Sequence, residues 1–169
     1  SSVEPSLWPA GEGAAAKRLA QFVRTRIEGY NSARNTPSED GTSTLSPYLA
    51  VGAISPRQCL DAAMTANPVK RGSALDSGSI GITTWISELI WREFYVHILA
   101  AFPRVCMGRA FKPATERIRW SDDAAAFSRW QEGRTGFPIV DAGMRQLAAT
   151  GWMHNRLRMI TAMFLTKDL

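Results

Sequence analysis

The chain has 169 residues, of which 45% are hydrophobic and 21% charged, and this composition indicates a folded globular protein and excludes a disordered one. Lysine and arginine number 20 against 15 aspartates and glutamates, so the net charge is +5, which alone is weak support for a polyanionic partner. The two cysteines, Cys59 and Cys106, and the two histidines lack the spacing of metal ligands, which argues against a metal site and a histidine-based triad. We expect both cysteines to be small core residues.

Apolar residues recur at helical spacing along most of the chain, and no segment alternates as a β-strand would, so we predict an all-α fold. The predicted helices cover residues 14–28, a short segment opened by 42–47, a segment opened by the Ser-Pro pair at 55–56, and residues 84–101, 121–133, 138–149 and 154–166. A polar loop is expected over 29–41. Glycine, serine and proline are concentrated in 67–82, which we predict to connect two helical lobes, 1–66 and 83–169.

A hydroxyl-rich segment opens the second predicted helix. Its residues are Thr42, Ser43, Thr44, Leu45 and Ser46. Hydroxyls and free backbone N–H groups at a helix start suit a phosphate or pyrophosphate, and Tyr30 and Arg34 in the preceding loop could close over the same anion. The alternative is ordinary N-capping, for which one hydroxyl suffices.

The predicted helix over 84–101 carries rings and charges on one side. Trp85, Glu88, Trp91, Arg92 and Tyr95 fall within an arc of roughly 120°. Such a face suits a site that stacks on flat rings and hydrogen-bonds their edges. In the alternative, both tryptophans are core residues and Glu88 and Arg92 form a routine surface pair. Because the rest of the helix is apolar around nearly its whole circumference, we expect it to be buried and its charges to be paired or functional.

The last predicted helix has two unlike sides. Asn155, Arg158 and Met159 share one side, which is polar, basic and polarizable and therefore suits the edge of a ligand. Leu157 lies on the opposite side, which we expect to face the core. His154, just before the helix, is expected to be a cap or a residue that supports the ligand-contacting side chains, and not a ligand.

These motifs, in this order and spacing, resemble the photolyase/cryptochrome family, and most of all its bacterial class I cyclobutane pyrimidine dimer photolyases. The segments that carry the resemblance are 42–46, 89–95, 111–113, 130–147 and 150–159. The resemblance covers essentially the whole chain and implies a helical FAD-binding domain. It also implies that the α/β antenna domain of the family would precede Ser1, and that the FAD-binding domain is incomplete at its C-terminal end.

The same resemblance assigns roles to individual residues. Those expected to hold the flavin phosphates are Tyr30, Thr42, Ser43, Thr44, Leu45 and Ser46. Those expected to line the flavin are Trp85, Arg92 and Asn155, with Arg158 close to its ring. Those expected to face the dimer are Glu88, Trp91, Asn155 and Met159. Those expected near DNA phosphates are Arg34, Arg92 and Arg156. Trp120, which alone would be interpreted as a half-exposed packing residue, corresponds to the outermost tryptophan of the chain that photoreduces the flavin.

The function implied is light-driven repair of cyclobutane pyrimidine dimers, the reaction of a deoxyribodipyrimidine photo-lyase. Excited, reduced FAD gives one electron to a dimer flipped out of the duplex, which is how photolyases as a class reach their target. The sequence does not identify the antenna chromophore. It shows no signal peptide and no apolar run of transmembrane length, so we expect a cytoplasmic monomer whose partner is dimer-containing DNA.

Family segments that would follow Leu169 carry residues near the flavin ring, so we expect this polypeptide alone to bind FAD weakly or not at all and to be inactive. One alternative is a cryptochrome-type blue-light photoreceptor, against which Trp91 and Met159 argue. The other is a helical DNA-binding fragment without a cofactor, which would make the hydroxyl-rich segment and the face around Glu88 coincidental.

Overall fold

The structure is a computed structural model that describes residues 3–69, 72 and 74–169, and within these ranges every regular element is helical, which confirms the all-α prediction. The chain divides into two compact units, which are described separately. The first, the α1–α5 unit, is Ala10–Ile118. The second, the α6–α8 unit, is Arg119–Leu169 together with the start of the chain up to Pro9. No helix in the described ranges is long and apolar enough to span a membrane.

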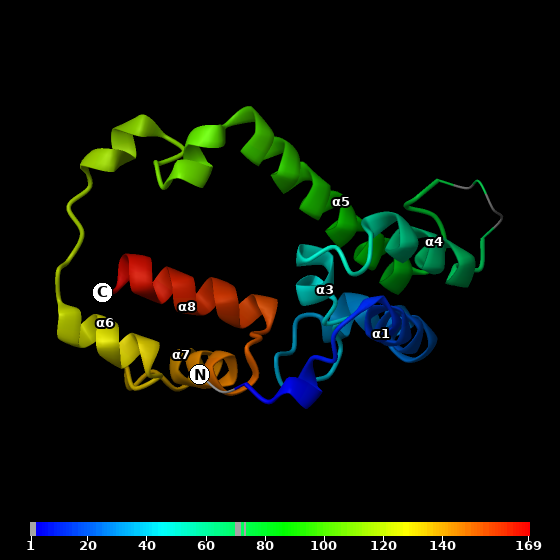
Figure 1. Ribbon diagram of the computed structural model, residues 1–169, viewed down its shortest axis with the longest axis horizontal. Coiled ribbons are helices and arrows are strands. Elements are labelled where there is room, and N and C mark those ends of the chain that lie inside the picture. The colour runs from blue at the N-terminus through cyan, green and yellow to red at the C-terminus, as the bar shows by residue number, and fades with distance from the viewer. Residues whose placement is uncertain (1–2, 70–71, 73) are drawn as a thin grey trace. The chain divides into compact units, whose positions relative to one another are not determined.

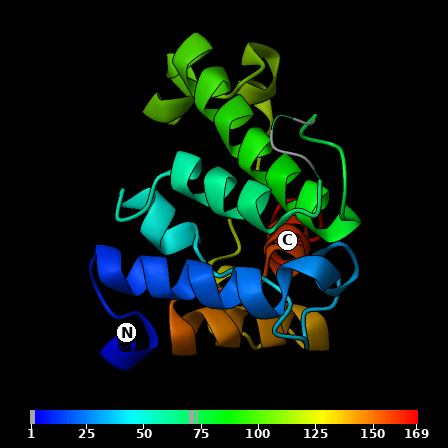
Figure 2. The same cartoon turned by 90° about the vertical axis from the view of Figure 1, so that its right-hand side faces the viewer.

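The α1–α5 unit contains five α-helices and three 3₁₀ turns within its described residues (Figure 1). They are α1 (Glu12–Thr25), η2 (Ile27–Gly29), α2 (Tyr30–Ala33), α3 (Ser46–Ala50), α4 (Pro56–Ala66), α5 (Ile80–Ala101), η3 (Pro103–Met107) and η4 (Pro113–Arg117). Helix α4 packs against both α1 and α5, and Figure 2 shows it between them. The short helix α2 lies in the segment that was predicted to be a polar loop. The sequence pattern missed it because four residues are too few to show an apolar period.

Sequence signals predicted the start of α4 correctly and the start of α5 less well. Ser55 begins α4 with a complete capping box, in which its hydroxyl accepts from the backbone N–H of Gln58 (3.2 Å) and the Gln58 side chain accepts from its backbone N–H (2.8 Å). Helix α5 begins at Ile80, four residues earlier than predicted. The reason is that Ser79, at its N-cap, is fixed from outside the helix by side chains that no local pattern reveals.

The predicted connector 67–82 does not separate the two compact units, because the chain divides at 118–119 instead. Asn67, at the end of α4, is buried, and its side-chain amide donates to the carbonyl of Ser77 (2.8 Å) and accepts from the N–H of Ser79 (3.2 Å). These bonds close the loop, so that α4 and α5 pack together. Residues 70, 71 and 73 of the predicted connector lie outside the described residues.

Helix α5 starts in very close contact with the η2 turn. A Cβ atom at Gly81 would lie 2.1 Å from the carbonyl oxygen of Glu28 and 2.3 Å from that of Ile27, closer than any side chain allows. Two residues earlier, the hydroxyl of Ser79, the N-cap of α5, donates to the Glu28 carboxylate. Glycine at position 81 therefore sets how closely α5 approaches η2, and with it the register between α5 and the η2–α2 segment.

An aromatic cluster forms part of the core of the α1–α5 unit. The ring of Phe22, on α1, lies 5.1 Å from that of Trp85 and meets Tyr30 edge to face at 5.9 Å. All three side chains are buried. Aromatic pairs at these distances add stability beyond the area that they bury.

The prediction that α5 is buried around its whole circumference is wrong beyond Leu89. Ile82, Trp85, Ile86 and Leu89 are buried, but six later residues are 43–60% exposed. These six are Ile90, Trp91, Phe94, Tyr95, Val96 and Leu99. Elements η2, α2 and α4 pack against α5, and the burial pattern shows that they cover its first half.

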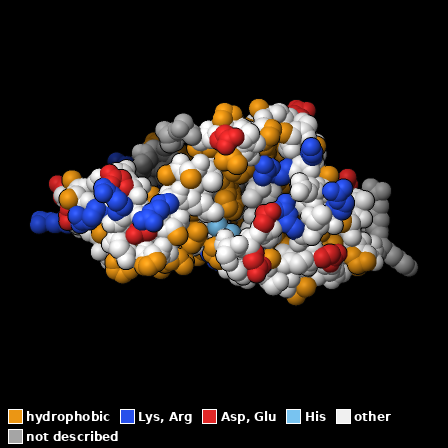
Figure 3. Space-filling view, turned by 90° about the horizontal axis from the view of Figure 1, so that it is seen from below, with side chains coloured by type: hydrophobic (Ala, Val, Ile, Leu, Met, Phe, Trp, Pro, Cys, Tyr) orange, Lys and Arg blue, Asp and Glu red, His pale blue; other side chains and the backbone are white. Residues whose placement is uncertain are grey.

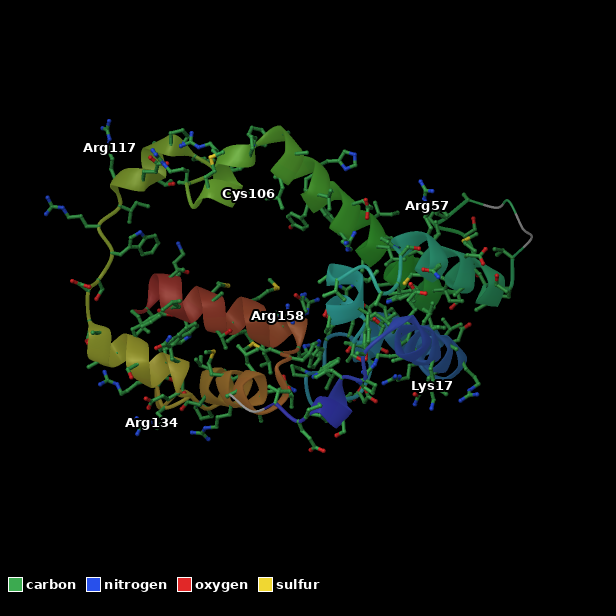
Figure 4. The ribbon with its side chains drawn as sticks, in the orientation of Figure 1. Lys17, Arg57, Cys106, Arg117, Arg134 and Arg158 are labelled. Carbon is green, nitrogen blue, oxygen red and sulfur yellow. The ribbon has the colours of Figure 1, made fainter. Side chains whose placement is uncertain are left out.

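The 3₁₀ turns after α5 are joined by ionic contacts. Glu116 accepts from Arg109 (2.7 and 2.9 Å) and from Arg104 (2.8 Å), and these bonds, those from Arg109 first, lower the pKa of its carboxyl to about 2. Cys106 lies in this segment and is exposed, so the prediction of a core residue is wrong there (Figure 4). Cys59, on α4, is buried as predicted, and burial raises the pKa of its thiol to about 11 although the charge of Arg92 lowers it.

The α6–α8 unit consists of η1 (Pro5–Leu7), α6 (Ala124–Gln131), α7 (Pro138–Thr150) and α8 (Asn155–Lys167). Met144, Met153 and Leu157 form its buried cluster, and Trp130 packs against it while its indole N–H donates to the carbonyl of Thr161 (3.1 Å). The indole N–H of Trp8 donates to the carbonyl of Thr150 (2.6 Å) and so ties the start of the chain to α7.

The close approach of α5 to η2 can be tested with two alanine substitutions. Gly81 and Gly13 are each the second residue of a helix, but a Cβ atom at Gly13 would meet no other atom within 4 Å. Gly81→Ala is expected to lower the free energy of unfolding by about 1–3 kcal/mol, because the new methyl overlaps backbone atoms. Gly13→Ala is expected to raise it by about 0.5 kcal/mol. Urea unfolding followed by circular dichroism measures both, and equal effects would contradict the close approach.

Candidate functional site

The candidate residues fall into two sets, one in each unit. The α1–α5 unit holds Tyr30, Arg34, Thr42, Ser43, Thr44, Leu45, Ser46, Trp85, Glu88, Trp91 and Arg92. The α6–α8 unit holds Trp120, Asn155, Arg156, Arg158 and Met159.

The hydroxyl-rich segment is not used to cap a helix. The N-cap of α3 is Leu45, a buried residue, and in this described part of the chain no side chain makes the cap hydrogen bond. Thr44 has a positive φ of 49°, which is uncommon for a residue with a side chain and is found most often at functional sites. The structure therefore does not support the alternative of ordinary N-capping.

Arg18, on α1, belongs with this segment, and no sequence pattern predicted that it would. Its guanidinium donates to the hydroxyl of Thr44 (2.6 Å), and that hydroxyl donates to the carbonyl of Ser43 (2.8 Å). The guanidinium carbon also lies 5.6 Å from the ring centre of Tyr48. A positive charge is thus fixed beside a row of partly exposed hydroxyls, a combination that suits a phosphate. Arg18 and Thr44 are 26 residues apart, too far for any local pattern to connect them.

Glu88 and Arg92 do not pair with each other as the alternative interpretation of α5 would have it. Glu88 pairs with Arg34, with 2.6 Å between Oε1 and the guanidinium Nη1. Arg92 pairs with Glu93 (2.8 Å) and points one N–H toward the carbonyl of Leu49, at a long 3.4 Å. Both charged residues of the face are therefore engaged with groups outside the predicted pair.

The two tryptophans of α5 have different surroundings. Trp85 is buried in the aromatic cluster with Phe22, as a core residue would be. Trp91 is 53% exposed and forms a cluster with Phe94 and Tyr95, at 5.3 and 6.3 Å between ring centres. Trp91 is thus, with Tyr95, a ring of this face that an external flat group can reach.

The two sides of α8 are as predicted. Leu157 is buried, whereas Asn155, Arg158 and Met159 are exposed. Arg158 extends from the first turn of the helix, and its Nε donates to the carbonyl of Met153 (2.9 Å) (Figure 4). Arg156 directs a guanidinium N–H toward the sulfur of Met159 (3.9 Å).

His154 caps α8, as predicted. Its Nδ1 accepts from the backbone N–H of Arg156 (3.1 Å), and the backbone N–H of His154 donates to the side-chain oxygen of Gln146 (3.1 Å). The imidazole is 1% exposed. Burial, with a smaller effect of the charge on Arg156, lowers the pKa of His154 below its ordinary value. The ring is therefore neutral in the folded unit at neutral pH, which it must be to accept this hydrogen bond.

Trp120 is 65% exposed. It lines a cavity of about 300 Å³ whose other lining residues are Ser121, Asp123, Phe127, Leu165, Thr166 and Leu169. Asp123 caps the following helix through a bond from the N–H of Ala126 (2.9 Å), so α6 begins at Ala124, three residues later than predicted. An indole that is open to solvent suits the outermost position of an electron-transfer chain.

Asp141 is a conspicuous acid of the α6–α8 unit with a structural role. Its carboxylate accepts from the hydroxyl and the N–H of Thr135 (both 2.7 Å) and from the N–H of Gly136 (3.0 Å). These bonds, with the Thr135 hydroxyl first, lower the pKa of the carboxyl. Asp141 thus holds the loop between α6 and α7, and its charge is already satisfied.

Charge is mixed over the surface. Figure 3 shows arginine side chains over α6 and α7, with acidic side chains among them. The net charge of the chain does not gather into a single basic patch on this face. Within the described residues, no group of three or more histidine, cysteine, aspartate or glutamate side chains could hold a metal ion.

A second cavity, of about 570 Å³, lies between α4 and α5. Its walls include Leu60, Ile86 and Leu89, with Arg57 and Glu93 among the lining residues (Figure 4). They come from outside the set of candidate residues, so this cavity is separate from the charged face around Glu88.

Comparison with known proteins gives consistent similarities. The family described as the FAD-binding domain of DNA photolyase matches residues 85–169. The chain is 51% identical to a deoxyribodipyrimidine photo-lyase of Neurospora crassa, over 97% of the chain and 26% of that protein. It is 48% identical to that of Escherichia coli, over 99% of the chain and 34% of that protein. The chain therefore spans about a third or less of the length of these relatives.

Two solved structures show the same fold. A bacterial class III photolyase from Agrobacterium tumefaciens superposes with a TM-score of 0.86 at 40% identity, over 97% of this chain and 32% of that one. A cryptochrome from Synechocystis superposes with a TM-score of 0.81 at 32% identity, over 94% of this chain and 32% of that one.

The buried cap at His154 leads to a prediction about pH. Because its pKa is lowered in the folded state, the unfolded chain takes up a proton more readily, so stability is expected to fall as the pH drops below about 6.5. His154→Asn keeps an N-cap acceptor but cannot titrate. The urea midpoint of the variant is therefore expected to decrease less between pH 7 and pH 5 than that of the unsubstituted protein. Equal slopes would show that His154 is not responsible.

Proposed function

The chain belongs to the family of FAD-binding domains of DNA photolyases, and we propose on this basis that it takes part in light-driven repair of cyclobutane pyrimidine dimers in DNA. The observation that carries the proposal is the pairing of Glu88 and Trp91 one turn apart on α5. The ring of Trp91 is 53% exposed and the side chain of Glu88 is 33% exposed, so both can meet a dimer that is flipped out of the duplex.

The residues of the α1–α5 unit fit the phosphate end of FAD. The hydroxyls of Thr42, Ser43 and Thr44 are partly exposed, and the Arg18 guanidinium beside Thr44 supplies a positive charge. When bound, reduced FAD supplies the light-excited electron that splits the dimer. We assign Leu45, Ser46 and Tyr30 to the same phosphate site. Trp85, Arg92, Asn155 and Arg158 are assigned to the flavin on the resemblance of their motifs.

Lesion recognition falls to the exposed side chains. Trp91 offers a ring on which a base can stack, and stacking of this kind tolerates any base. Glu88 offers carboxylate oxygens to the N–H groups of the base edges. We propose that Asn155 and Met159 also contact the dimer, since both are exposed on α8. A dimer is poorly stacked and paired to begin with, so flipping it out costs less than flipping normal bases.

Binding to the DNA backbone is assigned to Arg34, Arg92 and Arg156. Contacts of arginine with phosphate do not depend on sequence, and they weaken as the salt concentration rises. One flipped-out lesion needs only one face around Glu88 and Trp91, so we propose that the protein acts as a monomer. We also propose that it works in the cytoplasm and that its partner is DNA that contains dimers.

A blue-light receptor without repair activity is the second candidate, because the Synechocystis cryptochrome has the same fold. Trp91 and Met159 favour repair, since a stacking ring and a polarizable side chain serve a bound lesion. Trp120, by its exposure, would serve photoreduction in either case.

Because this polypeptide alone is expected to bind FAD weakly or not at all, repair is tested on the flavin-loaded, full-length protein that carries these residues. The substrates are ultraviolet-damaged thymine oligonucleotides under blue light. Trp91→Ala is expected to lower the rate of dimer loss at limiting DNA about tenfold or more, because a stacked base contributes about 1–3 kcal/mol. Glu88→Ala is expected to lower repair as well. Leu99→Ala, also exposed on α5 but outside the candidate set, is the control and should leave repair unchanged.

The outcomes separate the two candidates. Repair that survives in Trp91→Ala and Glu88→Ala would contradict the assigned face. Absence of repair in the unsubstituted protein with its flavin bound would instead favour the photoreceptor.

A further inference from the structure

The ion pair between Arg34 and Glu88 joins two residues that the proposed function assigns to different parts of the DNA. Arg34 is assigned to the phosphate backbone and Glu88 to the bases of the dimer. Their side chains are 19% and 33% exposed, so both can be reached from solvent. Among the described residues, Glu88 forms an ion pair with Arg34 alone. Arg92, one turn further along α5, pairs with Glu93 instead. The carboxylate that would meet the lesion is thus already occupied.

The fold holds this pair in place from both sides. Arg34 follows α2 directly, and its backbone N–H donates to the carbonyl of Tyr30 (3.0 Å). Its guanidinium carbon lies 5.5 Å from the ring centre of Tyr30, a buried residue, which favours a cation over that ring. The Arg34 guanidinium is therefore held against the core by the Tyr30 ring, and its side chain does not extend freely into solvent.

Glu88 is positioned by the register of α5. Gly81 lies against Ile27 and Glu28, and Glu88 is seven residues after Gly81 just as Arg34 is seven residues after Ile27. Two contacts with the same separation mean that the η2–α2 segment and α5 run in the same direction. The ion pair thus follows from the backbone packing.

The two roles compete for the same atoms. A carboxylate oxygen bonded to a guanidinium is less available to the N–H groups of a base. A guanidinium, however, also matches a phosphate by two parallel hydrogen bonds, so a phosphate can take the place of the Glu88 carboxylate. An ion pair that solvent can reach contributes little to folding, so it can be exchanged without disturbing the unit.

Building on the proposed function, we propose that Arg34 is a positioning residue that holds Glu88 in the DNA-free protein and releases it when a phosphate beside the lesion takes the guanidinium. Contact with the DNA backbone then makes the carboxylate available to the dimer. Glu88 is kept in a defined place until DNA arrives, and it is not left to bind stray cations.

The exchange predicts a particular sign of coupling between the two residues. Each single substitution removes a contact with DNA but also removes the need to break the ion pair. The double substitution removes both contacts with DNA, but the free energy of breaking the ion pair is saved only once. In the sum of the two single variants it is counted as saved twice. Arg34→Gln/Glu88→Gln is therefore expected to bind dimer DNA more weakly than the product of the two single losses, by at least about threefold.

The measurement uses the full-length protein that carries these residues, with its flavin bound and in the dark, and a duplex that carries a single thymine dimer. Dissociation constants are determined for the unsubstituted protein, the two single variants and the double variant. The ion pair of Arg26 with Asp40 supplies a matched control, because the Arg26 side chain is also 19% exposed and neither residue is in the candidate set. The cycle of Arg26→Gln and Asp40→Asn is expected to show no coupling.

Multiplicative losses, or a double variant that binds better than the product, would overturn the exchange, since the pair would then be unaffected by DNA or made stronger by it. If Arg34→Gln does not fold, Arg34→Lys is used in the same cycle, and a smaller coupling of the same sign is expected. Light-driven repair by the unsubstituted protein is measured alongside. Its absence would count against the proposed function, whereas its presence with multiplicative losses would count against the exchange alone.

Discussion

The α1–α5 unit depends on how closely the start of α5 approaches the η2 turn. At Gly81 the two backbones leave no room for a side chain, and this contact fixes the register of everything that follows on α5. One turn later Trp85 reaches the aromatic core, and two turns later Glu88 reaches Arg34. The third turn carries Trp91 beyond the packed region, where its ring is open. A core residue, a paired charge and an accessible ring thus follow one another along one helix.

Local signals in the sequence were reliable where a structural feature is local. The helix start at Ser55, the cap at His154 and the two sides of α8 were all predicted, because each depends on residues within about one turn of one another. The pairs Arg34–Glu88 and Arg18–Thr44 were not, since packing brings them together and no spacing connects them. The burial of α5 was overestimated for a related reason: an apolar circumference shows that a helix can be buried, but not how far its partners extend along it. The roles of the candidate residues came from motif resemblance and not from geometry.

The two ends of the proposed working surface are held in different ways. At the phosphate end, Thr44 is held by its backbone conformation and by bonds to Arg18 and Ser43. At the lesion end, Trp91 and Glu88 are side chains on a helix surface that can change rotamer. A rigid end suits a cofactor that stays bound through many turnovers, whereas an adaptable end suits a substrate that must enter and leave.

The surroundings of the two cysteines differ so much that a thiol reagent can label one of them selectively. A thiol reacts as its thiolate, and Cys59 is both shielded and, with a pKa of about 11, almost entirely protonated near neutral pH. Cys106 is exposed in η3, just past the end of α5. A maleimide dye or nitroxide would therefore attach at one position without any substitution. A spectroscopic reporter placed there would follow the open end of α5 in an otherwise unaltered protein.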